Sequence, residues 1–194
     1  MLNVTCKKSD VGYASNTYVI SSNDETAVID PSYPYNESLI VGKLKYIILT
    51  HSHFDHMLEI DSWQKATGAP VLVSEYEEKA PADANYNCYK LFLGVENGYY
   101  GPVTTIHDGD ELILGAETLK VIECPGHTQG SIALYSAPFA FVGDTIFEGG
   151  GFGRFDLPGG DFFKLRESLK KLTKLPEGTT VLPGHGNDFT LRKY

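Results

Sequence analysis

The chain has 194 residues, which suits one domain with a substantial hydrophobic core. Its formal net charge of −9 argues against nucleic acid as a partner, because nucleic-acid-binding surfaces are basic. No apolar run at the N-terminus or elsewhere has the length of a signal or membrane segment. The three cysteines, Cys6, Cys88 and Cys124, are too few and too scattered for a disulfide framework, so we expect a reduced cytoplasmic protein.

The first part of the chain predicts an opening β-meander. Segments 4–7, 18–21 and 26–29 are rich in β-branched and apolar residues, with turn-forming residues between them. Asp30 ends the third strand, and residues 36–42 form a short helical or irregular link.

A dense cluster of potential metal ligands follows the next strand. Residues 46–49 are apolar and predict a buried strand that ends at Thr50. In an extended segment His51 and His53 point to the same side, and a following helix would turn the next side chains toward them. Neutral imidazole and carboxylate are the usual ligands of zinc-like ions, so this strand end predicts a metal site. Its four potential ligands lie within six consecutive residues: His51, His53, Asp55 and His56.

The middle of the chain predicts a helix that ends at Gly68, a strand over 71–73, and a hairpin over 106–121 with turns at 108–110 and 114–116. Between them, residues 81–101 are irregular and rich in aromatics, which favours packing over the lining of a substrate pocket. The residues concerned are Tyr86, Cys88, Tyr89, Phe92, Tyr99 and Tyr100.

Three further strand ends each carry a potential metal ligand beside a glycine. Glycine lets the backbone approach a crowded site, and proline stabilises the turn that aims an imidazole. We therefore expect these ligands to join the first cluster. The pairs are strand 119–122 with His127, strand 139–142 with Asp144, and strand 179–182 with His185.

The last predicted helix is scaffold. Asp161 is a good N-cap, and lysines in the final turns suit the helix dipole. Apolar residues at helical spacing predict its buried face: Phe162, Leu165, Leu169 and Leu172.

These motifs match a known family in type and order. The sequence His51-x-His53-x-Asp55-His56, followed by His127, Asp144 and His185, resembles the metallo-β-lactamase fold and, within it, the hydroxyacylglutathione hydrolase (glyoxalase II) group. The resemblance spans nearly the whole chain, and residues 143–161 look like those of its short bacterial members. It implies an α/β (α+β) architecture, the αβ/βα four-layer sandwich of two mixed β-sheets flanked by helices.

The resemblance also implies two divalent metal ions, with zinc expected and iron or manganese as alternatives. Asp144 would bridge them. One ion would be bound by His51, His53 and His127, and the other by Asp55, His56 and His185.

Full-length glyoxalase II enzymes continue past the last histidine into a helical segment that holds glutathione, whereas this chain ends at Tyr194. We therefore expect a single domain over residues 1–194 without that segment. The expected partner is a small-molecule acyl thioester, of glutathione or of another thiol, and neither nucleic acid nor a membrane. We expect a monomer or a small homo-oligomer.

The expected chemistry is hydrolysis by a hydroxide that two metal ions share, since each ion lowers the pKa of bound water. Asp55 would be catalytic, binding one ion and orienting the hydroxide. No spare histidine is placed to act as a general acid for the leaving group. A thiolate leaves without prior protonation, because a thiol has a pKa of about 8.5, so a thioester is favoured over an amide or a β-lactam.

Three other side chains near the motifs have less defined roles. Arg154 follows the bridging Asp144 closely and either binds a substrate carboxylate or pairs with Asp156. His107 lies outside every motif and is expected to be a bystander, and Cys124 is expected to be structural.

Two alternatives remain open. Persulfide dioxygenases share this fold but bind one iron through two histidines and an aspartate. The complete second ligand set favours the dinuclear hydrolase over them, and His53 argues against the flavodiiron relatives, which have glutamate at this position. A non-enzymatic metal-binding protein on the same fold is the other alternative.

Overall fold

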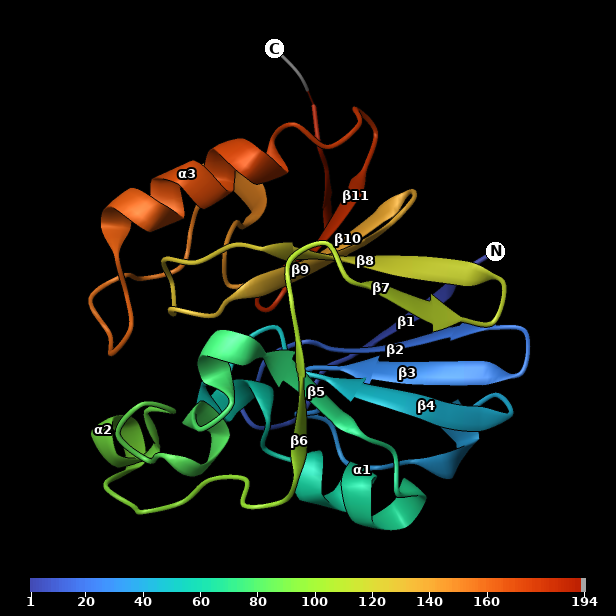
Figure 1. The fold of residues 1–194 in the computed structure, drawn as a ribbon, viewed down its shortest axis with the longest axis horizontal. Coiled ribbons are helices and arrows are strands. Elements are labelled where there is room, and N and C mark those ends of the chain that lie inside the picture. The colour runs from blue at the N-terminus through green and yellow to red at the C-terminus, as the bar shows by residue number, and fades with distance from the viewer. Residues whose placement is uncertain (193–194) are drawn as a thin grey trace.

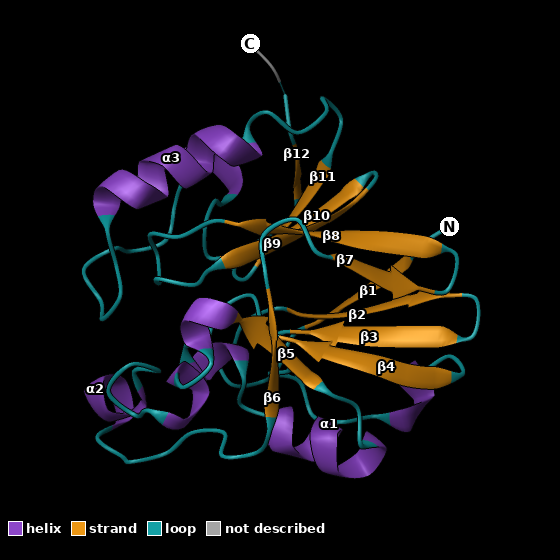
Figure 2. Ribbon diagram, viewed as in Figure 1, coloured by secondary structure: helices purple, strands orange, loops and turns teal. Residues whose placement is uncertain are grey.

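The structure is a computed structural model that describes residues 1–192. Two six-stranded mixed sheets pack face to face, and the helices lie on their outer faces (Figures 1 and 2). The predicted αβ/βα sandwich is confirmed. The first sheet has the order β1 (Asn3–Lys7), β2 (Thr17–Ser22), β3 (Glu25–Ile29), β4 (Lys43–Ile48), β5 (Val71–Ser74) and β6 (Val103–Ile106). The second has the order β12 (Phe189–Thr190), β11 (Thr180–Pro183), β10 (Phe139–Gly143), β9 (Ile132–Ser136), β8 (Glu117–Glu123) and β7 (Glu111–Leu114).

Three α-helices and five 3-10 helices complete the described chain. The helix α1 (Ile60–Thr67) lies below the first sheet in Figure 1, and α3 (Phe162–Leu172) lies above the second. The short helix α2 (Tyr89–Leu93) lies to one side of α1, at the left of the view. The 3-10 helices are η1 (Glu37–Leu39), η2 (Phe54–His56), η3 (Glu75–Glu77), η4 (Ala80–Ala82) and η5 (Glu148–Gly150).

The inner strands β2, β3 and β5 of the first sheet are buried at almost every position, so this part of the sheet is covered on both faces. Along β4, Ile47 belongs to the outer cluster around Trp63 of α1, and Ile48 belongs to the cluster between the sheets. Successive residues of a strand point to opposite faces, so one apolar run supplies both cores. In the inter-sheet core Ile48 shares its cluster with Leu119 and Phe141 of the second sheet.

The predicted hairpin over 106–121 is only partly right. β6 ends at Ile106 in the first sheet, and β7 begins at Glu111 in the second. The turn at 108–110 therefore carries the chain from one sheet to the other, and the hairpin is β7–β8. Turn residues mark a reversal of the chain but do not specify which sheet the next strand joins. The sequence analysis also missed β9, which lies in the middle of the second sheet.

The two predicted helices differ from expectation at their first turns. The chain after the histidine motif forms η2 first, and α1 begins only at Ile60 before it ends at Gly68, as predicted. In α3 the prediction that Phe162 is buried is wrong, since this residue is 41% exposed. Ser168 takes its place on the inner face together with Leu165 and Leu172, while Leu169 is half-buried.

The first turn of α3 is joined to the loop that carries His127. The predicted N-cap is confirmed, since Asp161 accepts hydrogen bonds from the backbone of Phe163 and Lys164. The backbone N–H of Asp161 donates to the carbonyl of Gly126 at 2.8 Å. Gly126 has φ +132°, and a Cβ there would lie 2.6 Å from Leu165 Cβ. The helix thus determines where the following histidine lies.

No helix within residues 1–192 is long and apolar enough to cross a membrane. Cys6, Cys88 and Cys124 are free thiols.

Candidate metal centre

All seven predicted ligands converge at one place between the two sheets. They lie on loops that follow four strand ends: His51, His53, Asp55 and His56 after β4, His127 after β8, Asp144 after β10, and His185 after β11. Three groupings of these side chains have ligand atoms within 4.8 Å of one another. The structure therefore brings together, at four strand ends, the seven side chains that the sequence predicts as ligands.

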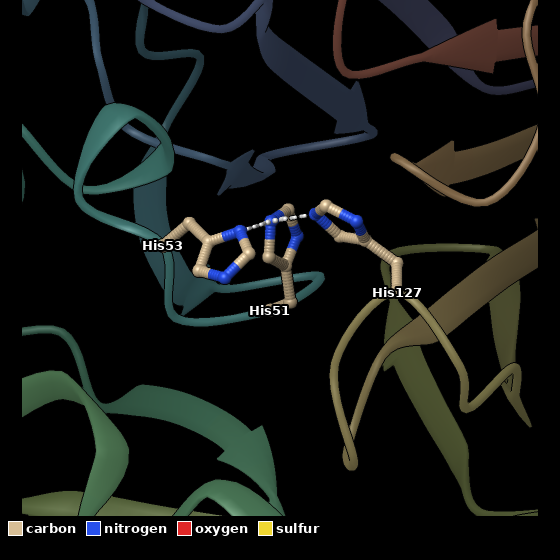
Figure 3. Close-up of side chains that lie close together, drawn as sticks. All are labelled: His51, His53 and His127. Carbon is tan, nitrogen blue, oxygen red and sulfur yellow. Dashed lines mark hydrogen bonds between the residues drawn. The ribbon is translucent and has the colours of Figure 1, made fainter. Parts of the chain in front are cut away.

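The first triad consists of three buried histidines. The Nε2 atom of His51 lies 3.2 Å from Nδ1 of His53 and 3.2 Å from Nε2 of His127 (Figure 3). Ligand atoms 2.0–2.1 Å from a tetrahedral ion are separated by roughly 3.3–3.4 Å. Both separations are close to those of ligands around a zinc-sized ion, and all three side chains offer ligand atoms within 4.8 Å of one another.

The second triad is more open to solvent. The Oδ2 atom of Asp55 lies 3.1 Å from Nε2 of His185, and His56 completes the group. His56 is fully buried, whereas the side chains of Asp55 and His185 are 19% and 35% exposed. A substrate would therefore approach the centre from the side of Asp55 and His185.

Asp144 lies between the two triads. Its Oδ1 atom is 3.3 Å from Nε2 of His56, and its Oδ2 atom is 3.6 Å from Nε2 of His185 and 3.8 Å from Nε2 of His127. One carboxylate thus reaches imidazoles of both groups, which is the arrangement required of a bridging ligand.

Three buried atoms of the ligand side chains have no hydrogen-bond partner in the protein: His53 Nε2, His56 Nε2 and Asp144 Oδ1. His56 Nε2 and Asp144 Oδ1 face each other without a hydrogen bond of acceptable geometry, and neither has another partner. Buried polar atoms are normally hydrogen-bonded, so unpaired ones need an explanation such as an ion. The donor set of imidazole and carboxylate fits a divalent metal.

Asp30 is a residue that the sequence analysis missed. Its Oδ2 atom accepts a hydrogen bond from His56 Nδ1 at 2.8 Å and one from Thr50 Oγ1 at 2.7 Å, and the residue is 1% exposed. Because Nδ1 carries the proton, the lone pair of Nε2 points at the centre. One signal in the sequence could have identified Asp30: it is an aspartate directly after the apolar strand β3. Because Ile29 of β3 pairs with Ile48 of β4, Asp30 lies beside the strand end that carries the histidine motif.

The backbone orients His127 in the same manner. Its Nδ1 donates to the carbonyl of Arg154 at 2.6 Å, which leaves Nε2 free. Of the two predicted roles of Arg154, the pairing with Asp156 is present as two parallel hydrogen bonds of 2.9 and 2.8 Å. The guanidinium also lies 5.8 Å from the centroid of the Phe92 ring.

Glu77 is a second residue that sequence reasoning missed. It is 1% exposed, and its Oε1 accepts a hydrogen bond from Thr128, next to His127. A Cβ at Gly130 would lie 3.0 Å from Ser74 Oγ and still closer to the Glu77 side chain. Burial raises the pKa of the Glu77 carboxyl. This side chain braces the His127 loop against η3.

Glycines allow the loops to approach the centre closely. A Cβ at Gly184 would clash with Asp144 Oδ1 and lie 2.5 Å from His56 Cε1. A Cβ at Gly153 would lie 2.8 Å from His127 Nδ1. No larger residue fits at either position without moving a ligand.

The protonation states of the first triad suit metal binding. Burial and the neighbouring imidazoles hold the pKa of His51 well below its usual range, and burial with His127 lowers the pKa of His53 to about 3. Neutral imidazole is the form that binds metal. Burial lowers the pKa of His56 too, but Asp30 and Asp144 outweigh it and raise that pKa. Burial opposes ionisation of Asp144, yet His56 and His185 lower its pKa overall.

A cavity of about 180 Å³ opens onto the centre. Of the aromatic segment 81–101, Tyr89 and Tyr99 are buried in the core, while Phe92 and Cys88 line the cavity, so both packing and pocket lining occur. His107 is exposed and is not among the residues that line the cavity, and Cys124 is buried beneath α3. The cavity is lined by Tyr13, His53, Phe54, Asp55, Cys88, Phe92, His127, Asp144, Arg154 and Leu157.

Comparison with known families agrees with this geometry. The family model described as the metallo-beta-lactamase superfamily matches residues 10–185, which include all seven ligand positions. The chain belongs to this superfamily. It is therefore a hydrolase of the metallo-beta-lactamase superfamily with a cluster of metal-binding side chains.

Two curated relatives show how far the likeness extends. The probable metallo-hydrolase YqgX of Bacillus subtilis is 35% identical over 181 residues, a match that covers 89% of this chain and 85% of that protein. A hydroxyacylglutathione hydrolase of Hamiltonella defensa is 32% identical over 174 residues, which cover 88% of this chain and 60% of that protein. The match to the second relative thus spans less than two thirds of its length.

Two solved structures have the same fold over almost the whole chain. The BLEG-1 B3 metallo-beta-lactamase has a TM-score of 0.86 at 29% identity, covering 98% of this chain and 94% of that one. TTHA1623 in a di-iron-bound form has a TM-score of 0.80 at 28% identity, covering 97% and 94%. These relatives differ in the activity or the metal that their names state, so the substrate has to be argued from the site.

Proposed function

We propose that the protein binds two divalent ions and hydrolyses thioesters. His51, His53 and His127 would hold one ion, and Asp55, His56 and His185 the other. Asp144 would bridge them, as its placement between the two triads supports. Imidazole and carboxylate ligands suit zinc, and also iron and manganese.

The chain's own residues would then hold and orient the reactants. When bound, the two ions would acidify a shared water and polarise the carbonyl group of a substrate. Asp55 lines the cavity, and its side chain is 19% exposed at the open side of the centre. It is placed to accept a hydrogen bond from the attacking water and to orient it.

The ionisable groups in the cavity favour a leaving group that needs no proton. Among the described residues lining it, the ionisable ones outside the two triads and Asp144 are Tyr13, Cys88 and Arg154. Burial raises the pKa of the Cys88 thiol to about 11. No spare carboxylic acid or histidine is among them. A thiolate can leave unprotonated because a thiol has an ordinary pKa of about 8.5. An amine would have to leave as a far more basic anion unless it is protonated first.

The first expected result concerns metal content. Protein purified without chelator should contain about two ions per chain, counting zinc, iron and manganese together, because each triad supplies three ligands and Asp144 a fourth. Elemental analysis against protein concentration measures the ratio. A folded preparation that saturates with one ion, especially iron together with oxygen uptake in the presence of a persulfide, would contradict the dinuclear hydrolase and support the dioxygenase.

The second expected result tests the reaction itself. Metal-replete protein should hydrolyse a thioester such as S-lactoylglutathione faster than an oxygen ester, and a β-lactam negligibly, because the described cavity lining offers no spare histidine or carboxylic acid to protonate an amine. The lactam is the relevant comparison, since a B3 metallo-beta-lactamase is among the structures with this fold. Steady-state kinetics on the three substrates measure the ranking. Faster turnover of the lactam than of the thioester would refute the leaving-group argument.

The third expected result concerns Asp30. Asp30→Asn should weaken metal binding by about 10–100-fold, because His56 loses the carboxylate that orients its ring. Asparagine tolerates the positive φ of +52° at this position, so the backbone should be undisturbed. Competition with a chromogenic chelator measures the affinity. Asp61→Asn, which removes an exposed carboxylate from α1, is the control and should bind metal normally; equal affinity of the two variants would count against the role of Asp30.

A further inference from the structure

The cavity beside the metal centre has a continuous aromatic wall. The ring centroids of Tyr13 and Phe54 are 5.4 Å apart, and those of Phe54 and Phe92 are 5.9 Å apart. All three residues line the cavity, and Leu157 adds a further apolar side chain. Phe54 is 5% exposed, whereas Tyr13 and Phe92 are 46% and 49% exposed. The wall therefore runs from the buried floor of the cavity to its mouth.

The volume of the cavity limits what it can enclose. About 180 Å³ is below the range of about 300–1,000 Å³ found for pockets that enclose whole drug-sized ligands. One arm of a substrate fits beside the ligand side chains, and the remainder must extend past Tyr13 and Phe92. Contact with aromatic surface at the mouth favours an apolar arm.

The charge at the mouth is unsuited to an anionic arm. Arg154 is the one lysine or arginine among the described residues lining the cavity. Both oxygens of Asp156 accept hydrogen bonds from its guanidinium, so two of its five N–H donors are engaged and its charge is partly neutralised. The formal net charge of the whole chain is −9, which repels anions at long range. The glutathione moiety carries two carboxylates and one ammonium group, and a carboxylate is best recognised by a free guanidinium or ammonium.

We infer that the substrate presents a neutral, apolar arm to this cavity, and that Phe92 determines this specificity. The inference rests on the proposed thioester hydrolysis and specifies its substrate class. Glutathione thioesters are then poor substrates compared with thioesters of apolar thiols.

The test compares two thioesters with the same acyl group, S-acetylglutathione and the acetyl ester of 2-phenylethanethiol. The metal-replete wild-type protein should prefer the phenylethyl ester by at least about tenfold in kcat/KM. Phe92→Ser should reduce kcat/KM for that ester by about tenfold and leave S-acetylglutathione within about twofold. Phe163→Ser is the matched control, since Phe163 is 72% exposed and lies outside the cavity lining. It should change neither value.

A second variant tests the charge argument. Asp156→Asn frees the guanidinium of Arg154 and should improve kcat/KM for S-acetylglutathione by about three- to tenfold, through a lower KM. The phenylethyl ester should be unaffected. Asp61→Asn removes a carboxylate that pairs with Lys65 on α1, away from the cavity, and should affect neither ester.

Binding of uncleavable thioethers separates this inference from the proposed reaction. Calorimetry should show that methyl 2-phenylethyl sulfide binds wild-type protein more tightly than S-methylglutathione, and that Phe92→Ser removes the difference. If neither thioester is cleaved but this binding preference holds, hydrolysis of thioesters is refuted and the specificity of the cavity stands. If thioesters are cleaved but the glutathione compounds are preferred, or Phe92→Ser leaves the preference unchanged, the apolar-arm inference is overturned.

Discussion

Replacing Asp144 with alanine should reduce kcat by about 10³-fold or more, the largest effect of any single substitution in this protein. Its carboxylate oxygens lie 3.3 to 3.8 Å from nitrogens of His56, His127 and His185. Because these imidazoles belong to both triads, the loss of Asp144 removes a ligand from both proposed ions. Metal content should fall together with activity, and elemental analysis with steady-state kinetics measures both.

The control for Asp144→Ala is Asp61→Ala, which removes an exposed carboxylate of α1. It should keep full metal content and activity, and circular dichroism should show both variants folded. An Asp144→Ala protein that retains two ions per chain would contradict the bridging assignment, whatever its activity.

Gly184→Ala should cost about 10²-fold in kcat, although it adds one methyl group on a residue that binds no metal in the proposed site. The added Cβ would clash with Asp144 Oδ1 and lie 2.5 Å from His56 Cε1. Both neighbours are proposed ligands in a close-packed interior, so relief of the clash must displace one of them. The expected loss of unfolding free energy is about 1–3 kcal/mol, as for other overpacked sites.

The matched control for this variant is Gly12→Ala. Gly12 has no positive φ, and its Cβ would meet no atom within 4 Å. That substitution should leave both kcat and the urea midpoint nearly unchanged. A Gly184→Ala enzyme with wild-type kcat and normal metal affinity would show that the centre tolerates displacement, and the close-approach argument would then be wrong.

Local signals were sufficient wherever a residue's role depends on its neighbours in the chain. The apolar run at 46–49 predicts a buried strand, and Gly68 and Asp161 predict the end of α1 and the start of α3. Caps and strand patterns act over a few residues, so they can be read before the fold is known. The prediction that Phe162 is buried was wrong, although it also rested on a local pattern. Helical spacing shows which residues share a face of the helix, but not how far the sheet extends beneath that face.

Asp30 and Glu77 are residues whose roles could not be predicted from local sequence. Asp30 is 26 residues from His56 in sequence, and they meet because β3 and β4 pair in parallel. Glu77 and Thr128 are 51 residues apart and meet where η3 contacts the His127 loop. Neither residue belongs to a motif with recognisable spacing. Their contribution depends on burial and on partners that only the packed fold brings close.

The sequence by itself determined which seven side chains form the candidate site, since imidazole and carboxylate at strand ends predict metal binding from residue type and short spacing alone. It also determined the class of fold, because the motifs occur in the order of a known family. Only the tertiary structure decided which atoms meet. It placed Asp144 between the triads, paired Arg154 with Asp156, and joined Tyr13, Phe54 and Phe92 into one wall. These contacts join distant segments or depend on how loops pack, and pairing across a fold has no signature in local sequence.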